Sequence, residues 1–198
     1  MKKISILTTM ILCSFLFNIN AQQYIKIDTT IYSEVLDQIK AIDIFLPADY
    51  NDNPAQEYPV IYYLHGANGN QNSGLQEAEC YYETHSDNDD ITSPPAIFVC
   101  PDGSCPPYLG SMWVNSVLYG NYEDFIIEDV MGIIESTYRI KPNKNFRIIT
   151  GTSMGGFGSA WLGVNHPDKF RVCFPFTGFL AMSDTTMENW KNLCYEEN

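Results

Sequence analysis

From Tyr24 onward, apolar runs alternate with short polar segments. Three of the runs are nearly uninterrupted, which is typical of strands buried on both faces of a sheet. They span residues 59–64, 96–100 and 146–150. Two earlier segments, 25–28 and 39–45, alternate apolar with polar residues instead and predict an antiparallel pair. The pattern therefore predicts one sheet with buried central strands that opens with two antiparallel strands.

Helical spacing is clearest in segment 122–138, where apolar residues recur at intervals of three and four behind Asn121, a suitable N-cap. We expect this helix to cover one face of the sheet and its acidic residues to face solvent. The polar segment 71–92 predicts a solvated loop. A calcium site at its acidic run 87–90 is an alternative, although the ordered ligand pattern of a calcium loop is missing.

The most informative stretch is Gly151-Thr152-Ser153-Met154-Gly155. It follows a β-branched apolar run and precedes a helical pattern of small residues, so it predicts a strand, a tight turn and a helix. This is the Gly-x-Ser-x-Gly pattern of a nucleophile elbow, in which a strained serine needs glycine neighbours. Ser153 is thus the candidate nucleophile, and the backbone N–H of Met154 is a candidate oxyanion donor. An ordinary glycine-rich turn is the alternative.

A second informative loop, His65-Gly66-Ala67-Asn68, directly follows the predicted strand 59–64. A backbone N–H just beyond the glycine, that of Ala67 or Asn68, would complete an oxyanion hole. The alternative is a solvated turn at the end of the strand. We assign His65 to loop structure and not to proton transfer.

Segment 106–119 is rich in aromatic residues, glycine and proline, and it falls where an α/β sheet presents the loops at its carboxyl edge. Trp113 is therefore a candidate substrate-binding residue, and Asn68 is another. The alternative for Trp113 is that its ring only packs the loop.

The amino-terminal segment 1–21 has the features of a secretory signal peptide. Lys2 and Lys3 precede an apolar stretch over 4–17, and Ala21 offers a small residue for cleavage. An uncleaved membrane anchor is the alternative. We therefore predict a signal peptide at 1–21, a single domain over 22–198, and a secreted or periplasmic location.

Composition narrows the range of partners. The formal net charge of −13 makes nucleic acid and anionic membrane surfaces improbable partners. Removal of the signal leaves five cysteines from the total of 6, so at least one has no partner within the chain. Cys100 and Cys105 are close enough in sequence for a small disulfide loop, and buried thiols at Cys100 and Cys173 are the alternative. No Cys/His spacing indicates a zinc site.

Seven motifs together resemble the esterase D family of α/β-hydrolases, which includes feruloyl esterases, acetyl xylan esterases and S-formylglutathione hydrolases. They lie at 63–66, 101–103, 122–126, 138–140, 151–158, 165–170 and 177–178. The resemblance implies an α/β fold with a mostly parallel sheet and helices on both faces. It also implies Ser153 as nucleophile, with Met154 and Ala67 as oxyanion donors.

The resemblance further implies hydrolysis of a carboxylic ester through an acyl-enzyme, a chemistry that needs no metal or organic cofactor. With the predicted export, the expected substrate is an acyl ester of a polysaccharide. No stable membrane insertion is expected once the signal is cleaved.

The triad is the point at which the chain departs from the family. In α/β-hydrolases the order is serine, then acid, then histidine, yet the only histidine after Ser153 is His166, within a motif whose family role is structural. We expect the last strands, with the triad acid and histidine, to lie beyond Asn198, which would leave an apolar sheet edge unpaired and this chain alone inactive. The alternatives are a noncatalytic glycan- or ligand-binding protein on a hydrolase scaffold, and an enzyme whose base is His65 or His85.

Overall fold

The computed structural model describes residues 23–88, 90–91 and 95–178. The predicted signal peptide at 1–21 lies outside these residues. So do Cys194 and the final segment 179–198. None of the described helices is long and apolar enough to cross a bilayer.

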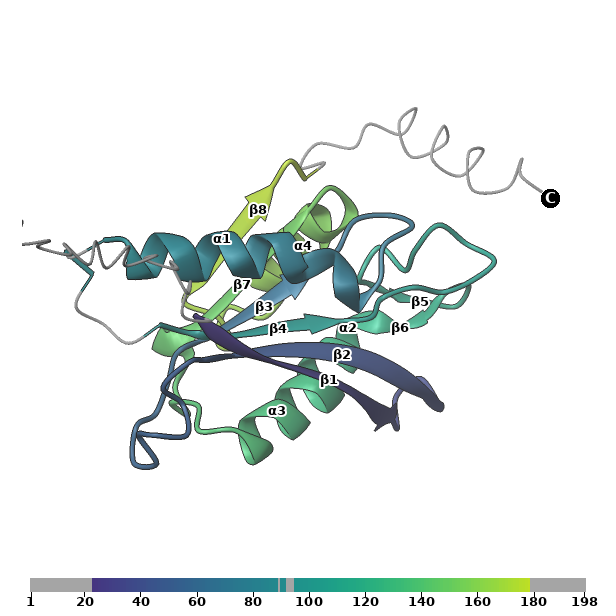
Figure 1. Ribbon diagram of the computed structural model, residues 1–198. Helices are drawn as coiled ribbons and strands as arrows, with labels where there is room; N and C mark the ends of the chain where they lie inside the picture. The colour runs from purple at the N-terminus through teal and green to yellow at the C-terminus, as the bar shows by residue number, and fades with distance from the viewer. Residues whose placement is uncertain (1–22, 89, 92–94, 179–198) are drawn as a thin grey trace, which may run out of the picture.

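The described residues build a six-stranded sheet in the order β1-β2-β4-β3-β7-β8 (Figure 1). Its strands are β1 (Tyr24–Ser33), β2 (Gln38–Pro47), β4 (Ile97–Pro101), β3 (Val60–Leu64), β7 (Arg147–Thr152) and β8 (Val172–Phe176). The pairs β1–β2 and β2–β4 are antiparallel, while β4, β3, β7 and β8 run parallel to one another. The predicted α/β architecture with a mostly parallel sheet and two antiparallel opening strands is confirmed.

The strand β3 shows why the centre of the sheet is apolar throughout. All five of its residues are buried, and because side chains alternate along a strand they enter two different cores. Val60, Tyr62 and Leu64 join one cluster, whereas Ile61 and Tyr63 join the other. A continuous apolar run is therefore what this position requires.

Helices cover both faces of the sheet. On one face lies α1 (Leu75–Ser86), which buries Ala78 and Tyr82 against Phe98 and its neighbours. On the other face runs a continuous helical segment formed by α2 (Tyr122–Asp124), the π-helix η2 (Phe125–Val130) and α3 (Met131–Thr137) (Figure 1). The helix α4 (Met154–Asn165) contributes Met154 and Leu162 to that second core. The remaining short elements are η1 (Gln71–Gly74), β5 (Asn115–Ser116), β6 (Gly120–Asn121) and η3 (Lys144–Phe146).

Three sequence predictions about local structure need correction. Segment 71–92 is not a loop, because η1 and α1 occupy most of it. The acidic residues of the 122–138 helix do not all face solvent, since Asp129 accepts hydrogen bonds from the Ser33 hydroxyl and from the Val35 N–H (3.1 Å). Cys100 is a buried thiol of β4, as the alternative held, but Cys173 is exposed on β8.

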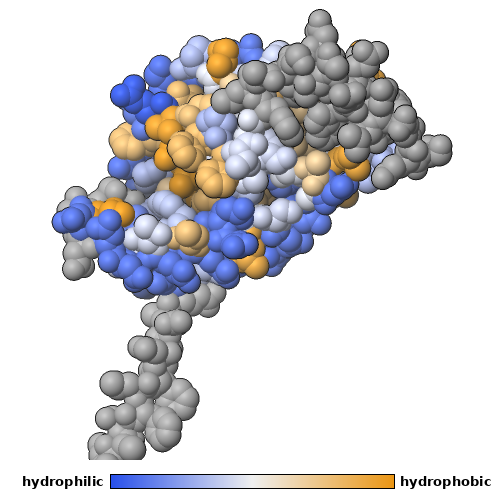
Figure 2. All heavy atoms as spheres, turned by 90° about the horizontal axis from the view of Figure 1, so that it is seen from above, coloured by the Kyte–Doolittle hydropathy of each residue, from blue (hydrophilic) through white to orange (hydrophobic). Residues whose placement is uncertain are grey.

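The outermost described strand, β8, carries an apolar edge. Val172, Phe174 and Phe176 have exposed fractions of 43%, 59% and 56%, although such side chains are usually buried. Seen from above, the surface has one group of hydrophobic side chains left of its centre, and others are scattered among hydrophilic residues (Figure 2). Among the described residues, β8 is the last strand of the sheet, and the apolar side chains on it are exposed.

Candidate active site

Ser153 stands alone between β7 and α4, in the turn that the sequence predicts. Its backbone has φ 55° and ψ −113°, a conformation that side-chain-bearing residues rarely adopt. Two contacts hold the turn: the Ser153 N–H donates to the Phe176 carbonyl of β8 (3.1 Å), and the Phe157 N–H donates to the Ser153 carbonyl (3.0 Å). A strained residue fixed by its neighbours in this way is a typical feature of a functional site.

The flanking glycines are required by close backbone contact and not by their own dihedral angles. A Cβ on Gly151 would lie 2.4 Å from the Leu64 carbonyl oxygen at the end of β3, and a Cβ on Gly155 would lie 1.8 Å from the same atom. The elbow therefore presses directly on the end of the neighbouring strand. This explains why both glycines of the motif are needed.

The strain at Ser153 leads to a stability prediction. We expect Ser153→Gly to be about 1 kcal/mol more stable than Ser153→Ala, because glycine relieves roughly 1–3 kcal/mol of backbone strain and loses part of it to the greater entropy of the unfolded chain. The comparison with alanine removes the hydroxyl in both variants. Urea unfolding of the two proteins measures the difference, and equal stabilities would contradict the strained geometry.

The loop after β3 approaches Ser153 closely. A Cβ on Gly66 would lie 3.5 Å from the Ser153 Cβ. The Asn68 N–H donates to the Leu109 carbonyl (2.6 Å), so it is already engaged. Of the two donors that the sequence left open, Ala67 is the better candidate beside Met154. The Asn68 residue is exposed and has φ 58°, which leaves its side chain available at this edge of the sheet.

The expectation that Trp113 binds substrate is wrong for this structure. Its side chain is fully buried, and its indole N–H donates to the His65 carbonyl (3.1 Å). The Trp113 side chain also fills the space that side chains on Gly103 and Gly158 would need. Its ring lies 2.4 Å from the Cβ position of Gly103, and its own Cβ lies 2.4 Å from that of Gly158. Trp113 thus packs the loop against α4, as the alternative held.

His65 is held in place through both of its ring nitrogens. Its Nδ1 faces the Gly66 carbonyl (2.7 Å), which can only accept, so Nδ1 carries the proton. Its Nε2 accepts from the Gly103 N–H (2.9 Å). Both ring nitrogens are engaged with the backbone, which agrees with a structural role and removes His65 as a base for Ser153.

A buried ion pair supports the loop beyond β4. The Lys40 ammonium lies 3.0 Å from the Asp102 carboxylate and donates to the Ser104 carbonyl (2.8 Å). Burial alone would raise the pKa of Asp102. The interaction with His65 (3.8 Å), the hydrogen bonds from Ser104 and the charge of Lys40 outweigh it, so that this pKa lies well below its usual range.

Neither of the other two histidines reaches Ser153. His166 follows the last residue of α4, a helix of 12 residues that spans about 18 Å from the elbow. It pairs with Glu123 (2.7 Å), which also accepts from the Trp161 indole (2.8 Å). His85 lies in the last turn of α1, which starts beyond the carboxyl end of β3 and leads back along the sheet. The chain has 3 histidines, so none of them serves Ser153 in this structure.

The Glu123 contacts were missed from the sequence, which predicted a solvated carboxylate. Glu123 joins the start of the 122–137 helical segment to the end of α4, through residues 38 and 43 positions away. No local sequence pattern predicts contacts between residues so far apart in the chain.

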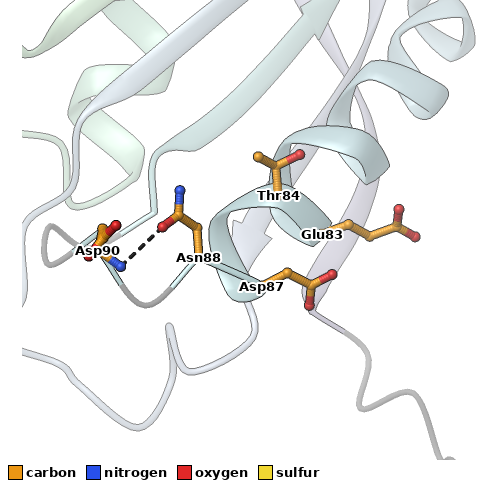
Figure 3. Close-up of a pocket in the computed structure, with 5 residues that line it drawn as sticks. All are labelled: Glu83, Thr84, Asp87, Asn88 and Asp90. Atoms are coloured by element: carbon orange, nitrogen blue, oxygen red, sulfur yellow. Dashed lines mark hydrogen bonds between the residues drawn. The ribbon is translucent and has the colours of Figure 1, made fainter.

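A pocket beside the acidic run is lined by Glu83, Thr84, Asp87, Asn88 and Asp90. The Glu83 and Asp87 carboxylates extend to one side of the helix end, and Asp90 lies on the other side, where its N–H donates to the Asn88 side chain (3.0 Å) (Figure 3). Within the part of the chain that the structure describes, no three His, Cys, Asp or Glu residues are grouped to hold a metal ion.

A mostly parallel sheet with helices on both faces, and a strained serine between a strand and a helix at its carboxyl edge, define the class of α/β-hydrolases. The sequence profile of the Esterase family matches residues 33–195. The chain belongs to this esterase family.

Comparisons with individual proteins agree with this assignment to an esterase family. An esterase of Mycobacterium tuberculosis is 29% identical over 154 residues, which are 77% of this chain and 32% of that protein. The structure of a ferulic acid esterase has 25% sequence identity and a TM-score of 0.73 over 82% of this chain and 61% of its own. An S-formylglutathione hydrolase from Staphylococcus aureus shares the fold, with 19% identity and a TM-score of 0.64 over 88% of this chain and 68% of its own.

The chain thus spans about a third of the mycobacterial esterase and about three fifths of the ferulic acid esterase that it matches.

Proposed function

We propose that this chain is the amino-terminal portion of a serine esterase that hydrolyses carboxylic esters through an acyl-enzyme. The observation that carries the proposal is the positive φ of Ser153, in a turn whose flanking glycines pack on the end of β3 and which lies beside the Gly66 loop. Strain of this kind is maintained only where the surroundings impose it. Membership of the esterase family supports the same activity.

In the proposed reaction, the Ser153 Oγ attacks the ester carbonyl carbon and gives its proton to a general base. The backbone N–H groups of Met154 and Ala67 donate to the oxyanion that forms. The alcohol leaves with that proton. Water then gives a proton to the base and attacks the acyl carbon, the bond to the Ser153 Oγ breaks, the carboxylic acid is released, and the serine takes the proton back. The chemistry needs no metal or organic cofactor. Because no histidine of this chain reaches Ser153, the acid and base of the triad would come from residues beyond Asn198.

For the substrate, we propose an acyl ester of a polysaccharide, of the feruloyl or acetyl type. The ferulic acid esterase is the neighbour with the TM-score of 0.73, and the predicted signal peptide at 1–21 supports a secreted or periplasmic location, where such esters occur. A noncatalytic glycan- or ligand-binding protein is the second candidate. It is favoured because no histidine of this chain reaches Ser153.

The test uses methyl ferulate and p-nitrophenyl acetate with this chain, with a version extended along its reading frame, and with Ser153→Ala in the extended version. We expect the extended protein to turn over ester and Ser153→Ala to lower kcat by at least about 10³-fold. This chain alone should show only residual activity. An extended, folded protein that binds glycan without turnover would refute the esterase and favour the second candidate.

A further inference from the structure

A cavity of about 390 Å³ lies at the carboxyl edge of the sheet, on the side of β2. The residues around it include Gln38, Lys40, Asp102, Tyr108, Tyr119 and Tyr122. Gln38 is the first residue of β2, and Asp102 directly follows β4, which is antiparallel to it. The cavity is of the size that small ligands and parts of larger ones occupy.

The positive charge at this cavity is neutralised. Lys40 is only 4% exposed, and its ammonium contacts the Asp102 carboxylate (3.0 Å), the Ser104 carbonyl (2.8 Å) and the Tyr122 hydroxyl (3.5 Å). These three partners take up its three N–H donors. Lys40 therefore fixes the wall and offers no charge to an anion, and the chain's net charge of −13 further disfavours anionic ligands.

The walls and rim combine aromatic rings with apolar and amide groups. The Tyr108 and Tyr119 rings meet edge to face with centroids 4.9 Å apart. Two apolar side chains at the rim, Ile39 and Leu118, are 69% and 40% exposed. Gln38, an exposed residue, supplies an amide that both donates and accepts. Aromatic rings and uncharged hydrogen-bonding groups together suit a ligand that has C–H faces and hydroxyl groups.

The loop that forms one wall of the cavity also contacts the candidate active site. Two residues beyond Tyr108, Gly110 lies against Met154, whose Sδ is 2.4 Å from where a Gly110 Cβ would be. The intervening Leu109 accepts the hydrogen bond from Asn68 (2.6 Å). Because two residues span at most about 7 Å, the cavity wall and the residue after Ser153 are close neighbours.

We infer that this cavity binds neutral sugar units of the alcohol part of the substrate while the ester lies at Ser153. The inference rests on the proposed function. It adds a site for the sugar units that do not react. One wall of this site is the loop that packs on Met154. Contacts with such remote parts of a substrate help to orient the reacting bond.

The test is calorimetric titration of the full chain with xylotetraose, which carries no ester and so reports on the cavity without turnover. We expect Tyr108→Ala to weaken binding at least tenfold and Gln38→Ala to weaken it about threefold. Phe146→Ala is the matched control, because it removes an exposed aromatic ring just before the amino end of β7, at the sheet edge opposite the cavity. Its affinity for xylotetraose should equal that of the wild type. Thermal melting checks that each protein is folded.

Trigalacturonate, an acidic sugar probe, should bind more weakly than xylotetraose. The inference is overturned if the folded wild type does not bind xylotetraose, if Gln38→Ala and Tyr108→Ala both bind it as tightly as the control, or if trigalacturonate binds more tightly. Should Tyr108→Ala fail to fold, Gln38→Ala decides alone. Loss of the proposed esterase activity would appear in the ester assay and would leave the xylotetraose result unchanged, so the two failures are distinguishable.

Discussion

Gly155→Ala is expected to lower the free energy of unfolding by about 3 kcal/mol or more. The added Cβ would lie 1.8 Å from the Leu64 carbonyl oxygen, 2.4 Å from the Leu64 carbonyl carbon and 2.8 Å from the His65 oxygen. All three are backbone atoms at the end of β3, so no side-chain rotation relieves the overlap. Thermal unfolding followed by circular dichroism should show a fall in Tm of roughly 6–12 °C.

The matched control for this substitution is Gly132→Ala in α3. Apart from its chain neighbours and the backbone of its own helix, no atom lies within 4 Å of the Cβ position on Gly132, and the residue is exposed. Alanine favours a helix over glycine by up to about 1 kcal/mol, so this variant should be slightly more stable than the wild type. The same change from glycine to alanine is thus expected to lower the stability at Gly155 and to raise it at Gly132. Similar Tm values for the two variants would show that the elbow is not packed on β3 as described.

Asp102→Asn is expected to destabilise the protein by about 2–3 kcal/mol at neutral pH. The substitution keeps the shape of the side chain but leaves the buried Lys40 ammonium without a countercharge, and breaking a buried pair on one side costs about 3–5 kcal/mol. We expect the lower value because the Asp102 side chain remains 15% exposed. Urea unfolding of both proteins measures the difference.

The pH dependence gives this prediction a second readout. Since the folded-state pKa of Asp102 lies below its unfolded value of about 3.9, its stabilising contribution is complete above that pH and is lost as the pH falls towards the folded pKa. The gap between wild type and Asp102→Asn should therefore narrow below about pH 4. A gap of constant size down to pH 2 would contradict the ion pair as its cause.

A double variant separates the buried charge from a general loss of packing. In Lys40→Met/Asp102→Asn neither charge is present, and the Ser104 carbonyl keeps its hydrogen bond from Tyr122 (2.8 Å). We expect the double variant to be more stable than Asp102→Asn alone, because apolar replacement of a whole buried pair is often neutral. A double variant as unstable as the sum of its parts would indicate that packing and not charge is responsible.

The elements that the sequence predicts well are those whose cause is local. Gly151 and Gly155 flank Ser153 because of contacts within one turn and one neighbouring strand, and the motif carries that information in five residues. The uninterrupted apolar run at β3 predicts a strand buried on both faces for a similar reason.

The sequence pattern did not predict the helix α1, because few apolar residues of this helix face the core. Only Ala78 and Tyr82 are buried among its 12 residues, and the acidic and polar remainder reads as a loop. A spacing of four between two apolar residues is too weak a signal on its own.

The role of Trp113 depends on contacts that no local pattern reveals. Its partners His65, Gly103 and Gly158 come from three separate parts of the chain, and together they enclose the ring. The exposure of Cys173 is likewise set by the position of β8 in the sheet, which composition does not show.

The hydrogen bond from the Ser153 N–H to the Phe176 carbonyl links the candidate nucleophile to the outermost described strand. Local unfolding of a protein costs the least free energy where few contacts hold an element. Exchange of the Ser153 amide with deuterium therefore requires β8 to detach at this point, and its protection measures the opening free energy of the edge and not that of the core. The free energy of local opening at the turn with the strained serine is therefore no larger than that of β8 beside it.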